Sequence, residues 1–192
     1  MTKIKLIIGL GNIGIQYSNN RHNIGFITID QLAYDLKTTF KLENKLHGFL
    51  ATTKIDDQTV YLLKPTTMMN DSGKAVKAVM NYFNIGVDEI AVIVDDIDRP
   101  YGALKIKKNG SSGGHNGLKS IADHIGTEEF IRVRIGVDRP AHEHNAVIKH
   151  VLGDFTKEQF EIEKPTILNA ADASHDLLMG KALNFVTNKY NK

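Results

Sequence analysis

The sequence predicts an α/β fold: a single domain whose twisted, mixed and largely parallel sheet is covered by helices on both faces. Two observations lead to this prediction. Short apolar, β-branched runs alternate with amphipathic helical stretches along the chain, a pattern typical of parallel strands joined by helices. The length of 192 residues favours one domain over two, so we expect residues 1–192 to fold as one unit.

The first part of the chain predicts a strand, a helix and a hairpin. The apolar run at residues 4–10 is expected to form a buried strand that leads into a glycine-rich loop. A helix is expected over 23–36, because apolar side chains recur there at three- and four-residue spacing. The runs 49–55 and 59–63 flank a polar turn and predict a hairpin, which makes the sheet mixed.

The rest of the chain alternates in the same way. Three further apolar runs predict strands, at residues 90–94, 103–107 and 130–137. Helices are expected over 72–83, with Gly86 closing the C-terminus, near 118–125, and from Lys157 onward. The polar segment 138–152 is expected to be a mobile flap over the substrate.

Composition excludes several classes of protein. The chain has no cysteine, which rules out disulfides, thiolate nucleophiles and cysteine-based zinc sites. No apolar run is long enough to cross a bilayer, and the first residues do not form a signal peptide. With 42% hydrophobic and 24% charged residues, we expect a globular, cytoplasmic protein.

The net charge of +2 indicates no particular partner, but one stretch is locally basic. Between Arg99 and Ala122 there is no acidic residue. The basic residues of this stretch are Arg99, Lys105, Lys107, Lys108 and Lys119. Such a stretch is either a solvated face or a binding surface for a polyanion, since clustered cations bind phosphates.

The first loop, Gly9 to Gly14, matches the glycine fingerprint of dinucleotide-binding proteins, which makes a nucleotide-dependent oxidoreductase the second hypothesis. That fingerprint requires a helix that opens at the loop and points its N-terminus at the pyrophosphate. Here a polar stretch follows, and the helix is expected only from about Arg21. The expected ribose-binding acid is also missing from a strand end, because Asp30 falls within the predicted helix.

Polar residues cluster beside the predicted strand ends, where loops of an open α/β sheet line one crevice. The clusters are Asn12, Tyr17 with Arg21-His22-Asn23, Met69-Asn70, Asp95-Asp96 and Gly113-Gly114-His115-Asn116-Gly117. Each residue alone could be a cap or turn residue. Together they supply a base, an acid that orients it and neutral donors for an oxyanion, a combination typical of acyl chemistry.

In order and spacing these residues resemble the bacterial peptidyl-tRNA hydrolases, over nearly the whole chain. The matching motifs are Gly9-Leu10-Gly11-Asn12, Tyr17, Arg21-His22-Asn23, Lys64-Pro65, Met69-Asn70-Asp71-Ser72-Gly73, Asp95-Asp96-Ile97-Asp98, Gly113-Gly114-His115-Asn116-Gly117 and Arg134-Ile135-Gly136-Val137. The resemblance implies hydrolysis of the ester between a peptide and the 3′ end of tRNA. It also implies a monomer without cofactor or metal, and no membrane partner.

The resemblance further implies particular roles. His22 would activate the attacking water, and Asp95 would orient its imidazole and stabilise the protonated form. The asparagines that would hold the peptide, the ester and the water are Asn12, Asn70 and Asn116. The residues expected to line the substrate crevice or to contact tRNA are Tyr17, Asn23, Met69, Lys107, His115 and Arg134.

Two alternatives and three departures remain. His142-Glu143-His144 could be a metal-ligand pair, although a flap is favoured there, and a non-catalytic RNA-binding protein on the same fold is the second alternative. The family usually has proline where Ile13 stands. It also has an aromatic residue at Met68 and an aliphatic one at Arg99. None of these departures removes a predicted catalytic group.

Overall fold

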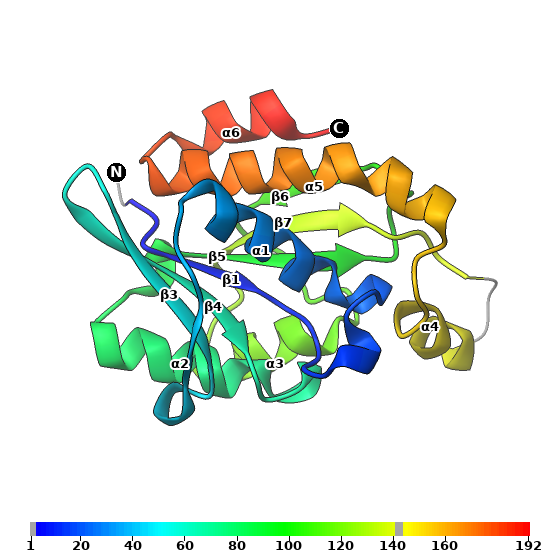
Figure 1. Cartoon of the computed structure of the whole chain (residues 1–192), viewed down its shortest axis with the longest axis horizontal. Helices are drawn as coiled ribbons and strands as arrows, with labels where there is room; N and C mark the ends of the chain where they lie inside the picture. The colour runs from blue at the N-terminus through cyan, green and yellow to red at the C-terminus, as the bar shows by residue number, and fades with distance from the viewer. Residues whose placement is uncertain (1–2, 141–143) are drawn as a thin grey trace.

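The computed structural model describes residues 3–140 and 144–192, and in these residues one mixed sheet runs through the molecule (Figure 1). The strands are β1 (Leu6–Gly9), β2 (Lys41–Glu43), β3 (Gly48–Ile55), β4 (Gln58–Pro65), β5 (Ile90–Asp96), β6 (Leu104–Lys107) and β7 (Ile131–Gly136). Their order in the sheet is β2-β3-β4-β1-β5-β7-β6. The four central strands β4, β1, β5 and β7 are parallel, and β2, β3 and β6 are antiparallel to their neighbours. The prediction of a mixed, largely parallel sheet is confirmed.

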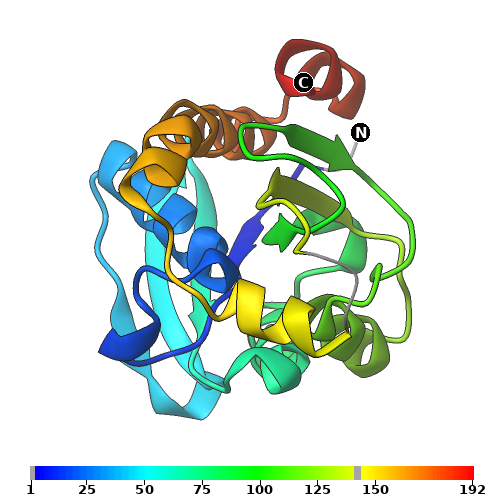
Figure 2. The same ribbon diagram turned by 90° about the vertical axis from the view of Figure 1, so that its right-hand side faces the viewer.

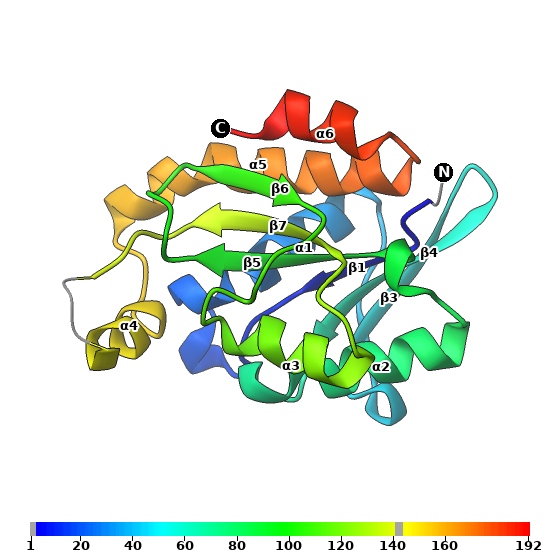
Figure 3. The ribbon, with the colours of Figure 1, turned by 180° about the vertical axis from the view of Figure 1, so that it is seen from behind.

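Helices cover both faces of this sheet (Figures 1 and 3). They are α1 (Ile24–Asp35), α2 (Ser72–Phe83), α3 (Asn116–Ile125), α4 (His144–Val151), α5 (Lys157–Leu178) and α6 (Leu183–Tyr190). Short 3-10 turns are η1 (Ile15–Tyr17), η2 (Arg21–Asn23), η3 (Asn44–Leu46), η4 (Met69–Asp71) and η5 (Val87–Glu89). Helices α1, α5 and α6 form one layer, and α2 and α3 form the other. No helix in the described part of the chain has the length and apolarity to cross a membrane.

Strand β5 is buried along its whole length, because both layers of helices pack on it. Ala91 and Ile93 belong to the apolar core on the side of α1 and α5. Ile90, Val92 and Val94 belong to the core under α2 and α3. Since both faces of β5 are filled, its polar residues Asp95 and Asp96 can only stand at its carboxyl end.

The glycine fingerprint does not open a helix. Strand β1 ends at Gly9, the next elements are the two short turns η1 and η2, and α1 begins only at Ile24. A side chain on Gly25 would collide with the backbone carbonyls of Leu10 and Ile93. The glycine therefore lets α1 cross β1 and β5 closely, which brings the preceding residue pair His22-Asn23 to the end of the sheet.

Three sequence expectations differ from the structure. Gly86 was expected to end α2, but Asn84 does so, with a left-handed φ of 54°, while Gly86 is extended. The helix from Lys157 is interrupted, because Gly180 adopts a φ of 85° between α5 and α6. In the expected flap, 144–151 is helix α4, whereas 141–143 lies outside the described residues. The mobility of that segment stays a prediction.

Candidate active site

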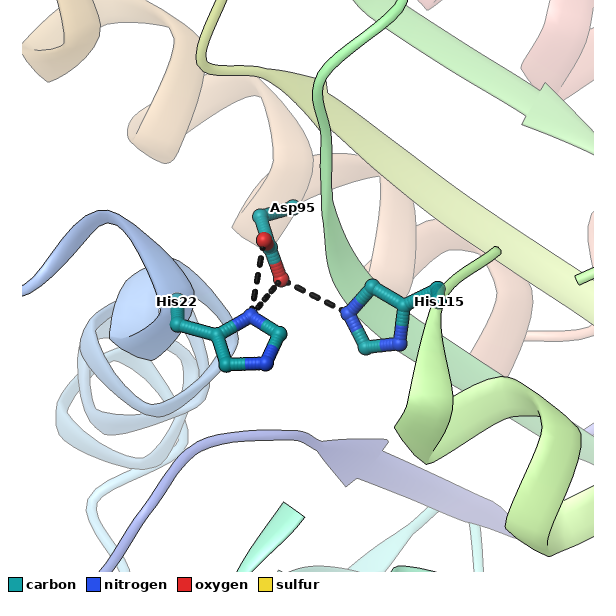
Figure 4. A group of neighbouring side chains, drawn as sticks. All are labelled: His22, Asp95 and His115. Atoms are coloured by element: carbon teal, nitrogen blue, oxygen red, sulfur yellow. Dashed lines mark hydrogen bonds and ion pairs between the residues drawn. The ribbon is translucent and has the colours of Figure 1, made fainter. Parts of the chain in front are cut away.

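Loops at one end of the sheet bring His22, Asp95 and His115 together from distant parts of the chain (Figure 4). His22 lies in the turn η2 before α1, Asp95 lies near the end of β5, and His115 directly precedes α3. The Nδ1 atom of His22 lies 3.0 and 2.8 Å from the two carboxylate oxygens of Asp95. The Nε2 atom of His115 lies 2.8 Å from Oδ1 of the same carboxylate. One buried aspartate therefore contacts two imidazoles.

Burial and neighbouring groups act in opposite directions on the ionisation of this cluster. Burial by itself raises the pKa of the Asp95 carboxyl, but the two imidazoles hold that pKa well below its usual range. Burial lowers the pKa of His22, yet the charge of Asp95 and the hydrogen bond to it raise this pKa above its ordinary value of 6.5. Asp95 is therefore an ionised carboxylate beside an imidazole whose basicity it increases.

The second ring nitrogen of His22 points away from Asp95 (Figure 4). Among the described residues, none forms a hydrogen bond with this Nε2 atom, and the ring lines both pockets of the crevice. With Nδ1 facing an ionised carboxylate, the proton of the neutral ring stays on Nδ1. The Nε2 atom is then left to accept a proton from a water molecule or a ligand.

Asn12 is held in place from two sides. The Asn12 backbone N–H donates to Oδ1 of Asn23 at 2.8 Å, and Nδ2 of Asn23 donates to the Asn12 carbonyl at 2.9 Å. The backbone N–H of Met69 donates to Oδ1 of Asn12 at 2.7 Å. Within the described residues the Nδ2 group of Asn12 has no acceptor, so it is the amide group left for a ligand. Asn23 is 2% exposed and supports Asn12, and its expected contact with substrate stays a prediction.

Two pockets adjoin at His22. The first, here called the Arg134 pocket, is lined among others by His22, Asp95, His115, Asn116, Arg134 and Ile148. The second, here called the Asn12 pocket, is lined among others by Asn12, Tyr17, His22, Met69, Asn70 and Asn116. Helix α4 lies across this end of the molecule (Figure 2). It contributes Ile148 and Val151 to both pockets. The structure thus brings nine of the eleven predicted site residues into one crevice, with Asn23 behind it and Lys107 outside it.

The predicted tRNA-binding cations lie on β6 and β7. Lys105 pairs with Arg134 and Lys107 pairs with Arg132, so the four side chains share one face of the sheet, here called the basic face. Arg134 is 8% exposed and donates from Nη2 to the carbonyl of Ser111. Lys107 is exposed and lies two register positions from Arg134, farther from the histidines. Their contacts with tRNA stay a prediction.

Sequence reasoning gave no function to Arg21, which anchors helix α4 to the site. Its Nε atom donates to the hydroxyl of Tyr101 at 2.8 Å, Nη1 to the carbonyl of His150 at 3.0 Å, and Nη2 to Oε1 of Gln159 at 2.8 Å. The residue next to His22 therefore joins the loop after β5, the end of α4 and the start of α5. No local pattern could predict this, because the partners lie 80 to 138 residues away.

Among the described residues, His22, Asp95 and His115 form the group of side chains that could hold a metal ion. The ligand atoms of His22, Asp95 and His115 lie within 4.8 Å of one another. Both facing nitrogens already make hydrogen bonds to the carboxylate, so a metal would have to replace these bonds. The alternative pair His142-Glu143-His144 has two members outside the described residues.

Comparison with known proteins assigns the chain to a family. The family model described as peptidyl-tRNA hydrolase matches residues 6–192. The chain belongs to the peptidyl-tRNA hydrolase family. A curated peptidyl-tRNA hydrolase from Limosilactobacillus fermentum is 44% identical over 188 residues, covering 98% of this chain and all of its relative. A second, from Leuconostoc mesenteroides subsp. mesenteroides, is also 44% identical, again over 98% of this chain.

Solved structures agree with this family assignment. The crystal structure of peptidyl-tRNA hydrolase from Acinetobacter baumannii superposes with a TM-score of 0.94 at 35% identity. The match covers 100% of this chain and 96% of that one. The resemblance found from the sequence motifs, and the fold it implied for a peptidyl-tRNA hydrolase, are confirmed. The dinucleotide hypothesis is not supported, because the loop after β1 lacks the helix that it requires.

Proposed function

We propose that this chain hydrolyses the ester bond between a peptide, or a blocked aminoacyl group, and the 3′ end of tRNA. The observation that carries the proposal is the hydrogen bond from His22 Nδ1 to a buried, ionised Asp95, beside a pocket with an available asparagine amide. Membership of the peptidyl-tRNA hydrolase family supplies the substrate class. The reaction returns free tRNA and a peptide from prematurely released peptidyl-tRNA.

In the proposed mechanism His22 is the general base. Its Nε2 atom takes a proton from a water molecule in the crevice, and the water oxygen attacks the ester carbonyl. Asp95 keeps the ring oriented and stabilises the imidazolium that forms, without taking the proton itself. The tetrahedral intermediate then collapses, the ester C–O bond breaks, and the imidazolium returns its proton to the 3′-terminal ribose oxygen of the tRNA. The products are a tRNA hydroxyl and a peptide carboxylic acid, which releases its proton to solvent and becomes a carboxylate.

The asparagine amides stabilise the negative oxygen of the intermediate and hold the peptide. Asn12 is the best-placed donor, because it lines the pocket, its Oδ1 is fixed by Met69 and its Nδ2 has no acceptor among the described residues. An amide held in this way needs no reorientation when charge develops on the ester oxygen. Asn70 and Asn116 are exposed at the rim, where they can bind the peptide backbone and the water.

The basic face supplies the attraction for tRNA. Four cations lie on the same face of β6 and β7, and one of them, Arg134, lies in the Arg134 pocket beside the histidines. A row of cations that leads to the crevice attracts phosphates and releases their counterions. We infer that the tRNA end follows this face toward His22, whereas the peptide lies on the Asn12 side. A cytoplasmic, monomeric state is proposed with this function.

The decisive experiment incubates the protein with N-blocked aminoacyl-tRNA and follows the release of free tRNA. His22→Ala should lower turnover by at least about a thousandfold and leave tRNA affinity within about twofold. His175→Ala, which removes a histidine in the last turn of α5, is the matched control and should keep the wild-type rate. Binding without hydrolysis by the wild-type chain would support a non-catalytic RNA-binding protein instead.

A further inference from the structure

We propose that His115 is a positioning residue: the N-terminus of α3 fixes its proton on Nε2, and this N–H holds the Asp95 carboxylate in place for His22. The inference rests on the proposed function, since it concerns the carboxylate that orients the base. It assigns different chemical states to the two histidines of the crevice. His22 exchanges protons with water, whereas His115 does not take part in the proton transfer.

The assignment follows from what each partner of His115 can donate or accept. An ionised carboxylate is only an acceptor, so the Nε2 atom that lies 2.8 Å from Oδ1 of Asp95 must carry a hydrogen. The backbone N–H of Leu118 is only a donor, and it points at Nδ1 of His115 over 3.3 Å. This Nδ1 atom must therefore be unprotonated. His115 is the N-cap of α3, and its ring is bonded at both nitrogens.

The two carboxylate oxygens of Asp95 bond differently to the two imidazole rings. Among the described residues, Oδ2 of Asp95 bonds only to His22, at 2.8 Å, whereas Oδ1 is shared between His22 at 3.0 Å and His115 at 2.8 Å (Figure 4). The ring centroids are 5.0 Å apart and the planes are tilted by 49°, so the rings approach the carboxylate from different sides. With Oδ1 fixed by His115, rotation of the carboxylate is prevented and Oδ2 stays directed at His22.

The packing around α3 fixes the position of the His115 ring. A side chain on Gly117 would lie 2.5 Å from Sδ of Met69 and 3.1 Å from Cε1 of His115. The absence of that side chain leaves room for the ring and for Met69, whose backbone in turn holds Asn12. The helix start, the histidine and the oxyanion donor thus form one connected arrangement.

The proton positions can be observed directly. In protein labelled with ¹⁵N at histidine, long-range proton–nitrogen spectra at pH 7 distinguish protonated from unprotonated ring nitrogens. We expect His115 to be protonated on Nε2 and bare on Nδ1, and the neutral form of His22 to show the opposite pattern. A proton on Nδ1 of His115 overturns the proposal. The spectrum does not require catalysis, so an inactive protein with the expected pattern would reject only the proposed function.

Two substitutions separate the two bonds of His115. His115→Asn keeps an N-cap acceptor for Leu118 but is too short to donate to Asp95, so kcat should fall about tenfold with KM within about twofold. His115→Gln keeps a donor at the reach of Nε2 but loses the cap. Its kcat should stay within about threefold of wild type, while its melting temperature falls by about 3 °C. Equal kcat losses in both variants, or no loss in His115→Asn, would overturn the proposal.

Discussion

Two buried carboxyl groups in this molecule, Asp95 in the crevice and Glu163 on α5, have pKa values that are shifted in opposite directions, although burial acts on both in the same way. Burial raises the pKa of each carboxyl group. At Asp95 two imidazoles more than offset this effect and keep the group ionised. At Glu163 the backbone N–H of Gly102 donates to Oε1, Oε2 has no partner among the described residues, and the pKa rises to about 7.

The difference shows that the charged and hydrogen-bonding neighbours of a buried carboxyl group, and not its degree of burial, decide whether it is ionised and available for catalysis.

The arginines of β7 extend the comparison to cations. Burial, together with the charge of Arg134, lowers the pKa of Arg132 to about 10, and its guanidinium donates to the backbone carbonyls of Gly110 and Glu128. The Nε atoms of both arginines lack partners among the described residues. Because these Nε atoms are buried, a phosphate would reach the basic face through exposed groups such as Lys107, whereas both oxygens of Asp95 are already bonded.

The largest effect is expected from removing the charge of Asp95. Asp95→Asn replaces an acceptor by a group that can donate, which disturbs the orientation and tautomer of His22, so kcat should fall by about 10³ to 10⁴-fold. Single-turnover release of tRNA measures this loss, and tRNA affinity should change little. Asp98→Asn, the same change on an exposed side chain three residues away, is the control. Similar losses in both variants would show that general charge, not the bonded pair, is what matters.

The basic face should affect binding rather than chemistry. Removing two phosphate contacts with Lys107→Gln and Arg134→Gln together should weaken tRNA binding about a hundredfold and lower the salt dependence by about two phosphates. Titrations with deacylated tRNA at several salt concentrations measure both quantities. Lys54→Gln, at an exposed position of β3 near the far edge of the sheet, should leave them unchanged. An unchanged salt slope in the double variant would separate this face from tRNA.

The pH dependence tests the influence of Asp95 on His22. The base works when it is neutral, so kcat/KM should rise with pH through a pKa above 6.5. In Asp95→Asn the charge that raises this pKa is gone, while burial still lowers it. The rise of kcat/KM with pH, measured on the residual activity of Asp95→Asn, should therefore occur about one pH unit lower than in wild type. A rise at the same pH as in wild type would show that Asp95 does not set the basicity of His22.

Sequence patterns predicted the regular elements best where burial is periodic. Helix α2 begins and ends at the expected residues, and both strands of the hairpin were found. Strand β2 was missed because its three residues are all exposed and show no alternation. The capping residue of α2, Asn84, was missed because glycine is the commoner residue in a left-handed cap.

For the site, the sequence predicted which loops meet but not how their atoms bond. Strand ends are local features, and the topology of a parallel sheet brings them to one edge. The second bond of Asp95, to His115, and the support of Asn12 by Asn23 depend on packing between separate segments. The three bonds of Arg21 require even more distant partners. Such bonds are consequences of the folded core, and no spacing in the sequence encodes them.

The smallest effect is expected at Glu163, and it tests the comparison away from the crevice. A carboxyl whose pKa rises from an ordinary 4.5 to about 7 on folding stabilises the protein fully below pH 4.5, and this contribution is lost as pH rises through 7. Glu163→Gln removes the titration. The melting temperature of the variant minus that of wild type should therefore grow between pH 4.5 and 7.5, by on the order of 1 kcal/mol or about 3 °C.

Glu161→Gln, two residues earlier on α5 and exposed, is the matched control and should give a difference that is flat with pH. A flat difference for Glu163→Gln as well would mean that burial with an unpaired oxygen does not raise the pKa of a carboxyl in this protein. The imidazoles would then have no strong effect of burial to offset at Asp95. A slope confined to Glu163→Gln would instead show that burial raises the pKa of a carboxyl with an unpaired oxygen, which is the effect that His22 and His115 offset at Asp95.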